Sequence, residues 1–85
     1  METFTYKIKD EIGIHARPAG ILAKKAKEFE SEIILKCNGK SANATKLIAL
    51  MGLGVKCGDT VEVTVSGKDE KEVLKIMQEF FSEHF

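Results

Sequence analysis

Val61-Glu62-Val63-Thr64-Val65 is the clearest strand pattern in the chain, because its three valines alternate with polar residues. The turn-forming residues Cys57-Gly58-Asp59 precede it, and Gly67 ends it. A strand of this kind buries one face and leaves the other in water. We therefore expect it to belong to a sheet that other elements cover on one side.

Three further strands are predicted by the same alternation, at residues 4–8, 31–37 and 40–43. The dipeptide Asn38-Gly39 between the last two supplies the positive backbone angles of a tight hairpin turn. The apolar positions that define the first two strands are Phe4, Tyr6 and Ile8, and then Ile33, Leu35 and Cys37.

Three helices are predicted between and after these strands. Residues 16–29 carry a helical stripe made of Ala19, Leu22, Ala23, Ala26 and Phe29. Residues 47–51 form a short helix that Gly52 and Gly54 end. The last helix starts at Asp69 as its N-cap, with Glu72 as capping-box partner. Its buried stripe consists of Val73, Leu74, Met77, Phe80 and Phe81.

The resulting order is β-α-β-β-α-β-α, and residues 1–85 form one domain. A right-handed crossover through the first helix makes the first two strands parallel, with the last strand between them. We expect an α+β fold, an open-faced β-sandwich in which three helices cover one face of a four-stranded sheet.

Composition is that of an ordinary globular protein, with 44% hydrophobic and 31% charged residues. The longest apolar run, Leu47 to Met51, is too short to insert into a membrane, and the first residues do not resemble a signal peptide. We therefore expect a cytoplasmic protein. Cys37 and Cys57 lack a metal-binding or CxxC spacing and are expected to be small apolar residues, with a disulfide disfavoured.

Charge is distributed unevenly although the formal net charge is zero. Residues 1–56 carry 10 Lys and Arg against 6 Asp and Glu, whereas residues 57–85 carry 3 against 7. This asymmetry predicts a basic face that docks on an acidic partner. Nucleic acid is disfavoured as a partner, because the basic part has no aromatic residues arranged to stack on bases.

The stretch Gly13-Ile14-His15-Ala16-Arg17-Pro18-Ala19 lies where a loop becomes the first helix. Pro18 suits the first turn, where a backbone donor is not required. His15 then lies at or just before the N-cap, beside the unpaired N–H groups of Ala16 and its neighbours. These amides and the helix dipole favour an anion and disfavour imidazolium. We expect a neutral, nucleophilic His15.

A phosphoryl group on the imidazole would meet these amides and the planar donors of Arg17. Gly13 permits an unusual backbone angle before the histidine, and Ile14 anchors the loop by burial. His15 alone is compatible with a simple helix cap, and Arg17 alone with a solvated charge. Their combination with Pro18 at a helix start favours a phosphoryl acceptor.

The segment from Gly13 to Ala19 resembles the active-site signature of the HPr family, the histidine-containing phosphocarriers of the bacterial sugar phosphotransferase system. The resemblance extends to Asn38-Gly39-Lys40, to residues 47–54 and to the closing helix. It implies that enzyme I, charged by phosphoenolpyruvate, phosphorylates Nδ1 of His15. IIA domains of sugar permeases then accept the group. It implies a monomeric carrier rather than an enzyme, with no metal or cofactor.

The resemblance also implies a docking surface around the histidine. Its apolar positions are Leu47, Ile48 and Met51, with Gly20, Leu53 and Gly54 nearby, and Lys24 and Lys27 form a basic rim. Such a surface gives transient contact and steers the carrier toward acidic partners. Without the resemblance, the apolar residues are equally compatible with the core, and the lysines with a solvated helix face.

Position 46 departs from the family pattern. Many HPr proteins carry a serine there that a dedicated kinase phosphorylates, whereas this chain has Lys46. Lysine cannot accept that modification and has the opposite charge to phosphoserine. We predict that the kinase-dependent regulation is absent. Thr45 is the alternative acceptor, but we expect it to be the N-cap of the short helix.

Two other functions remain compatible with the sequence. The first is a carrier in a parallel, nitrogen-type regulatory phosphorelay, with the same chemistry at His15. The second is a non-catalytic module that uses the same fold to bind a regulator, against which the presence of both His15 and Arg17 argues. His84, the other histidine, is expected at a frayed C-terminal end.

Overall fold

The computed structural model describes residues 1–14 and 16–85, and its elements follow the expected order. They are β1 (Glu2–Lys7), α1 (Ala16–Ala26), β2 (Glu32–Cys37), β3 (Lys40–Asn43), α2 (Leu47–Gly52), β4 (Thr60–Ser66) and α3 (Glu70–His84). The strand and short-helix predictions are confirmed. The hairpin turn is confirmed too, because Asn38 and Gly39 have φ angles of 55° and 75°.

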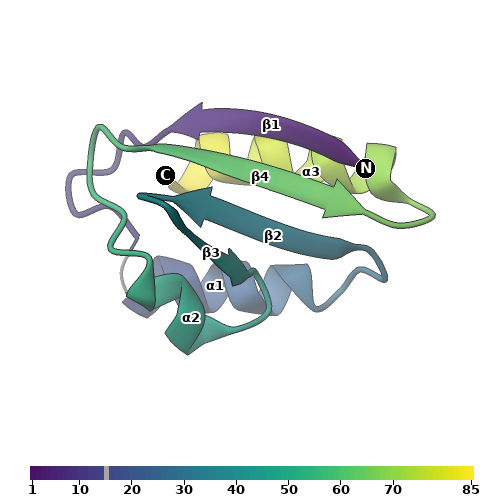
Figure 1. The fold of residues 1–85 in the computed structure, drawn as a ribbon, viewed down its shortest axis with the longest axis horizontal. Helices are drawn as coiled ribbons and strands as arrows, with labels where there is room; N and C mark the ends of the chain where they lie inside the picture. Colours follow the sequence, from purple (N-terminus) through teal and green to yellow (C-terminus); the bar gives the residue numbers. More distant parts are fainter. Residues whose placement is uncertain (15) are drawn as a thin grey trace.

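The sheet has the strand order β1-β4-β2-β3 (Figure 1). Since β4 is antiparallel to both β1 and β2, those two strands are parallel to each other. Strand β4 therefore occupies the predicted central position. Helices α1 and α3 lie behind the sheet in Figure 1, and α2 packs against α1 and β3 at its lower edge. This is the expected open-faced α+β sandwich.

The core lies between the helices and one face of the sheet. Val61, Val63 and Val65 are fully buried, as are Leu22 of α1 and Phe81 of α3. The valines project toward the helices, and the polar residues between them line the open face, where the hydroxyls of Thr3 and Thr64 lie 3.3 Å apart. The alternation read from the sequence thus separates the covered face from the open one.

Helix α1 is shorter than the predicted 16–29. After Ala26 the backbone tightens, since the N–H groups of Glu28 and Phe29 donate to carbonyls three residues earlier. Phe29 is half-buried and packs against the core from outside the helix. Its place in the apolar stripe was predicted correctly, but burial of its ring does not require a helical backbone.

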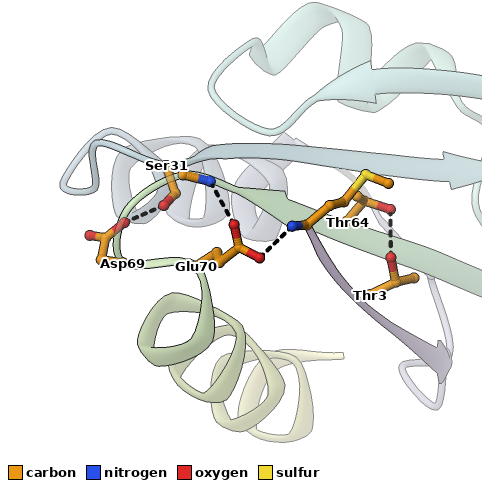
Figure 2. A network of polar contacts seen from close by, with 7 residues as sticks. Thr3, Ser31, Thr64, Asp69 and Glu70 are labelled. Carbon is orange, nitrogen blue, oxygen red and sulfur yellow. Dashed lines mark hydrogen bonds and ion pairs between the residues drawn. The ribbon is translucent and has the colours of Figure 1, made fainter.

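The predicted capping box of α3 is wrong in detail. Asp69 occupies the N-cap position, but its carboxylate accepts a hydrogen bond from the Ser31 hydroxyl instead (Figure 2). Glu70, rather than Glu72, accepts from the Gly67 N–H and pairs with the Met1 amino group. These donors, the amino group first, lower the pKa of Glu70. The network ties β1, the loop before β2 and the start of α3 together.

The predicted N-cap of α2 is also wrong. Lys46 is the N-cap residue of this helix. The hydroxyl and N–H of Thr45 both donate to Oδ1 of Asn43, at 2.7 and 3.0 Å. The local turn at Asn43 therefore uses the Thr45 side chain before the helix begins.

The C-terminal end is anchored, contrary to the expectation of fraying at His84. Helix α3 continues to His84, whose ring centroid lies 4.3 Å from that of Phe80. Phe85 is buried, and its carbonyl oxygen accepts from the N–H groups of Lys9 and Asp10 at 2.6 and 2.7 Å. An aromatic cluster and two backbone hydrogen bonds hold this end against the loop that follows β1.

The two cysteines are free thiols in different environments. Cys37 is buried, as expected of a small apolar residue, and burial raises the pKa of its thiol. Cys57 is exposed, so the expectation of an apolar role is wrong for this residue. Its thiol lies 3.8 Å from the carbonyl oxygen of Lys9.

Gly13 allows the loop after β1 to pack closely on the loop before β4. Its φ angle is 83°, and a Cβ atom there would lie 2.7 Å from Cα of Lys56. Gly39 has a similar φ of 75°, but a Cβ there would point into open space among the described residues. The two glycines thus share a left-handed conformation and differ in their surroundings.

We predict that Gly13→Ala lowers the free energy of unfolding more than Gly39→Ala. The left-handed conformation alone costs an alanine about 1–2 kcal/mol at either position. The overpacked contact at residue 13 adds about 1–3 kcal/mol. Urea denaturation of both variants measures the difference, and equal losses would show that the loop adapts without strain.

Candidate functional site

The segment expected to carry chemistry lies at one end of the molecule. The loop after β1, the start of α1, the end of α2 and the loop before β4 meet there, at the left of Figure 1. His15, the predicted acceptor, lies outside the described residues. The geometry of the site is therefore built from the residues on either side of it.

The chain that leads into residue 15 is fixed by burial and by hydrogen bonds. Ile14 is 7% exposed, as expected of an anchor, and its N–H donates to the carbonyl of Val55 at 3.2 Å. The N–H of Gly13 donates to the carbonyl of Asp10 at 3.1 Å. Gly13 has the positive φ that the sequence predicted. Residue 15 therefore follows directly on a rigid loop.

The chain that leaves residue 15 is helical from its first residue. Helix α1 begins at Ala16, so Pro18 occupies its first turn, as predicted. The N–H groups of this turn have no partner within the helix and point toward its N-terminal end, where they favour an anion. Ala16 and Arg17 are exposed, and Pro18 is half-buried. This end of α1 carries no acidic side chain to oppose a bound anion.

Helix α2 presents apolar side chains to water. Leu47, Ile48 and Met51 are 37%, 80% and 43% exposed, so they are not core residues. Leu50 faces inward and is fully buried. Leu53 is only 3% exposed, which corrects the expectation that it contacts a partner.

The remaining predicted docking positions are accessible. Lys24, Lys27 and Gly54 are exposed, and Gly20 is half-buried with open space where a side chain would project. A hollow of about 520 Å³ lies between the end of α1 and the start of α2. Its lining consists of Lys27, Phe29, Thr45, Lys46, Leu47 and Ile48. Lys46 thus adds a cation next to the predicted basic rim.

Two exposed apolar residues were missed by the sequence analysis. Ile12, in the loop after β1, is 66% exposed, and Ile21, on α1, is 42% exposed. Ile21 lies four residues after Arg17 and therefore one turn along the same helix face. Its position outside the buried stripe of α1 was the available signal, whereas a loop residue such as Ile12 has no periodicity to interpret.

Within residues 1–14 and 16–85, no group of three or more His, Cys, Asp and Glu residues is placed to hold a metal ion. None of the helices in this part of the chain has the length and apolar character that would let it cross a membrane. The chemistry that the described residues offer is recognition of an anion by amides and Arg17, beside an exposed apolar surface.

Comparisons with known proteins agree with this geometry. Residues 2–83 match the family model described as "PTS HPr component phosphorylation site". The chain is 44% identical to the phosphocarrier protein HPr of Mycoplasma genitalium over 75 residues, which cover 87% of this chain and 85% of that protein.

Solved structures of HPr proteins share the fold. An HPr from Thermoanaerobacter tengcongensis superposes with a TM-score of 0.92 at 34% identity, covering 100% of this chain and 96% of the other. A dimer of HPr from the same organism gives a TM-score of 0.67 at 35% identity, covering 94% and 98%. This chain therefore belongs to the HPr family, the phosphocarrier proteins of the phosphotransferase system.

Proposed function

We propose that Nδ1 of His15 accepts a phosphoryl group from phosphorylated enzyme I and passes it to IIA domains of sugar permeases. The observation that supports this most directly is the rigid setting on both sides of residue 15. The buried Ile14 precedes it, and the first turn of α1, with the exposed Arg17, follows it. Phosphoryl transfer requires alignment and charge stabilisation above all.

In the proposed transfer, the Nδ1 lone pair forms a bond to phosphorus while the bond between phosphorus and the donor's atom breaks. The electron pair of the broken bond stays with the donor. The three phosphoryl oxygens then face the unpaired N–H groups of α1, and the guanidinium of Arg17 offers further charged donors. The reverse steps on an acceptor protein regenerate the imidazole.

The proposed partners dock on the exposed residues of α2 and α1. Leu47, Ile48 and Met51 supply apolar contact, and Lys24 and Lys27 supply positive charge around it. An acidic partner face fits this surface. We propose that the carrier acts as a monomer in the cytoplasm, so that one copy presents the whole surface to each partner in turn.

Regulation by a kinase at position 46 is not part of the proposed function. Lys46 offers no hydroxyl. The hydroxyl of Thr45 is half-buried and donates to Asn43 at 2.7 Å, which makes it a poor acceptor for a kinase. Lys46 instead adds its positive charge to the basic rim formed by Lys24 and Lys27.

We expect His15→Ala to abolish labelling of the carrier by enzyme I and radioactive phosphoenolpyruvate, because the variant has no acceptor nitrogen at the site. The label on the unaltered protein should be labile in acid and stable in base. His84→Gln is the matched control and should retain full labelling. Label that persists in His15→Ala would show that another residue is the acceptor.

Arg17→Gln should reduce kcat for transfer from enzyme I by about tenfold or more, because a charged hydrogen bond is worth about 1.5–3 kcal/mol. Lys75→Gln removes an equal charge from the exposed face of α3 and serves as control. Rapid-quench kinetics of both variants provide the measurement. Equal rates in the two variants would leave Arg17 without a role in the transfer.

Met51→Glu should raise KM for enzyme I by about tenfold, since it places a carboxylate in an apolar contact facing an acidic partner. Little stability should be lost, because Met51 is 43% exposed. Gln78→Glu, an equal change on the exposed face of α3, is the control. A large drop in Tm for Met51→Glu, with KM unchanged, would indicate a core role.

A further inference from the structure

The exposed apolar residues are not scattered over the molecule. Large apolar side chains that are exposed in the described part of the chain are Met1, Ile12, Ile21, Leu47, Ile48 and Met51. All except Met1 belong to α1, α2 or the loop that leads to residue 15. Gathered apolar exposure of this kind marks an interaction surface.

Ile12 stands out in this group because it comes from the loop rather than from a helix. It is 66% exposed, less than Ile48 at 80% and more than Ile21, Leu47 or Met51. The loop and the end of α2 lie at the same end of the molecule (Figure 1). Gly13, the next residue, packs on the backbone of Val55 and Lys56, which follow α2. Ile12 therefore lies three residues before the predicted acceptor, on a loop that packs against the chain following α2.

The backbone at Ile12 is held in place by Asp10. The N–H of Ile12 donates to Oδ1 of Asp10 at 2.9 Å, and the N–H of Gly13 donates to the Asp10 carbonyl at 3.1 Å. The Asp10 N–H in turn donates to the carbonyl oxygen of Phe85 at 2.7 Å. Such a preorganised loop loses little conformational entropy when Ile12 is covered by a partner.

The charges around this surface define the partner. The sequences of α1 and α2 contain Arg17, Lys24 and Lys25 and no acidic residue, and Lys46 precedes α2. The loop beside Ile12 carries Asp10 and the exposed Glu11 instead. A partner that covers the apolar residues therefore fits best with carboxylates opposite the helices and an apolar patch opposite Ile12. Under the proposed function, two proteins must approach residue 15 this closely, the phosphoryl donor and then the acceptor.

We propose that Ile12 is a docking and specificity residue for the phosphoryl-donor protein, which covers it with an apolar patch when it reaches residue 15. This inference rests on the proposed function. It adds the loop after β1 to a surface that was otherwise assigned to the two helices. Contacts on the loop and on α2 together would hold the donor across the site from both sides.

The test compares steady-state transfer from enzyme I to three variants. Ile12→Ser should raise KM about tenfold, the effect expected when an isoleucine loses most of its apolar contact, with kcat within about twofold. Ile12→Val, which keeps a branched apolar side chain, should restore KM to within about threefold. Ile34→Thr, on the open face of the sheet, is the control and should leave KM unchanged.

The outcomes separate this inference from the proposed function. If Met51→Glu raises KM while Ile12→Ser does not, the carrier function stands and the role of Ile12 is refuted. A fall in kcat without a rise in KM for Ile12→Ser also refutes it. The loop would then affect the accepting residue 15 rather than docking of the donor. If the unaltered chain accepts no label at all, the proposed function itself fails. Thermal unfolding of Ile12→Ser should match that of the unaltered protein, and a large loss of Tm would count against a surface role.

Discussion

The antiparallel pairing of β4 with both β1 and β2 is the constraint on which the rest of the structure depends. It places Val61, Val63 and Val65 at the centre of the face that the helices cover, and it fixes the register in which Lys7 lies opposite Thr60. That register brings the loop after β1 against the loop before β4. Hydrogen bonds of 2.9 Å between Ile8 and Asp59, and between Gly58 and Ile8, continue the pairing beyond the strands. The rigid approach to residue 15 is thus an extension of the sheet.

Most of the fold could be predicted because its signals are local. Alternation identified the strands, Asn38-Gly39 identified the hairpin, and a right-handed crossover left one place for β4. Some errors were local, as at Thr45, whose hydroxyl bonds to Asn43 two residues earlier. Others occurred where a side chain found a distant partner. Asp69 bonds to Ser31, 38 residues earlier in the chain, and a capping motif cannot reveal such competition. The anchoring of Phe85 likewise depends on Lys9 and Asp10, near the other end of the chain.

The predictions for the candidate site also depend on whether the signal is local or tertiary. Gly13 and Pro18 have properties that backbone geometry imposes locally, and the structure places each as expected. Exposure of an apolar residue is a tertiary property instead. Leu53 and Met51 are two residues apart in sequence, yet one is buried and the other is exposed. The same limitation hid Ile12, because a loop offers no period from which its direction can be read.

The composition of the proposed docking surface suits a carrier that must leave each partner after transfer. Lysines around an apolar centre accelerate association by long-range attraction, which salt and solvent weaken at close range. Affinity then depends on the apolar contacts, and the apolar residues here are few and lie on separate elements. Few apolar contacts favour complexes with short lifetimes, since most differences in affinity between related complexes arise from the dissociation rate. A larger continuous apolar face would bind more tightly, but it would slow release and promote self-association. The few exposed apolar residues Ile12, Leu47, Ile48 and Met51 therefore fit the repeated, brief encounters of the proposed function.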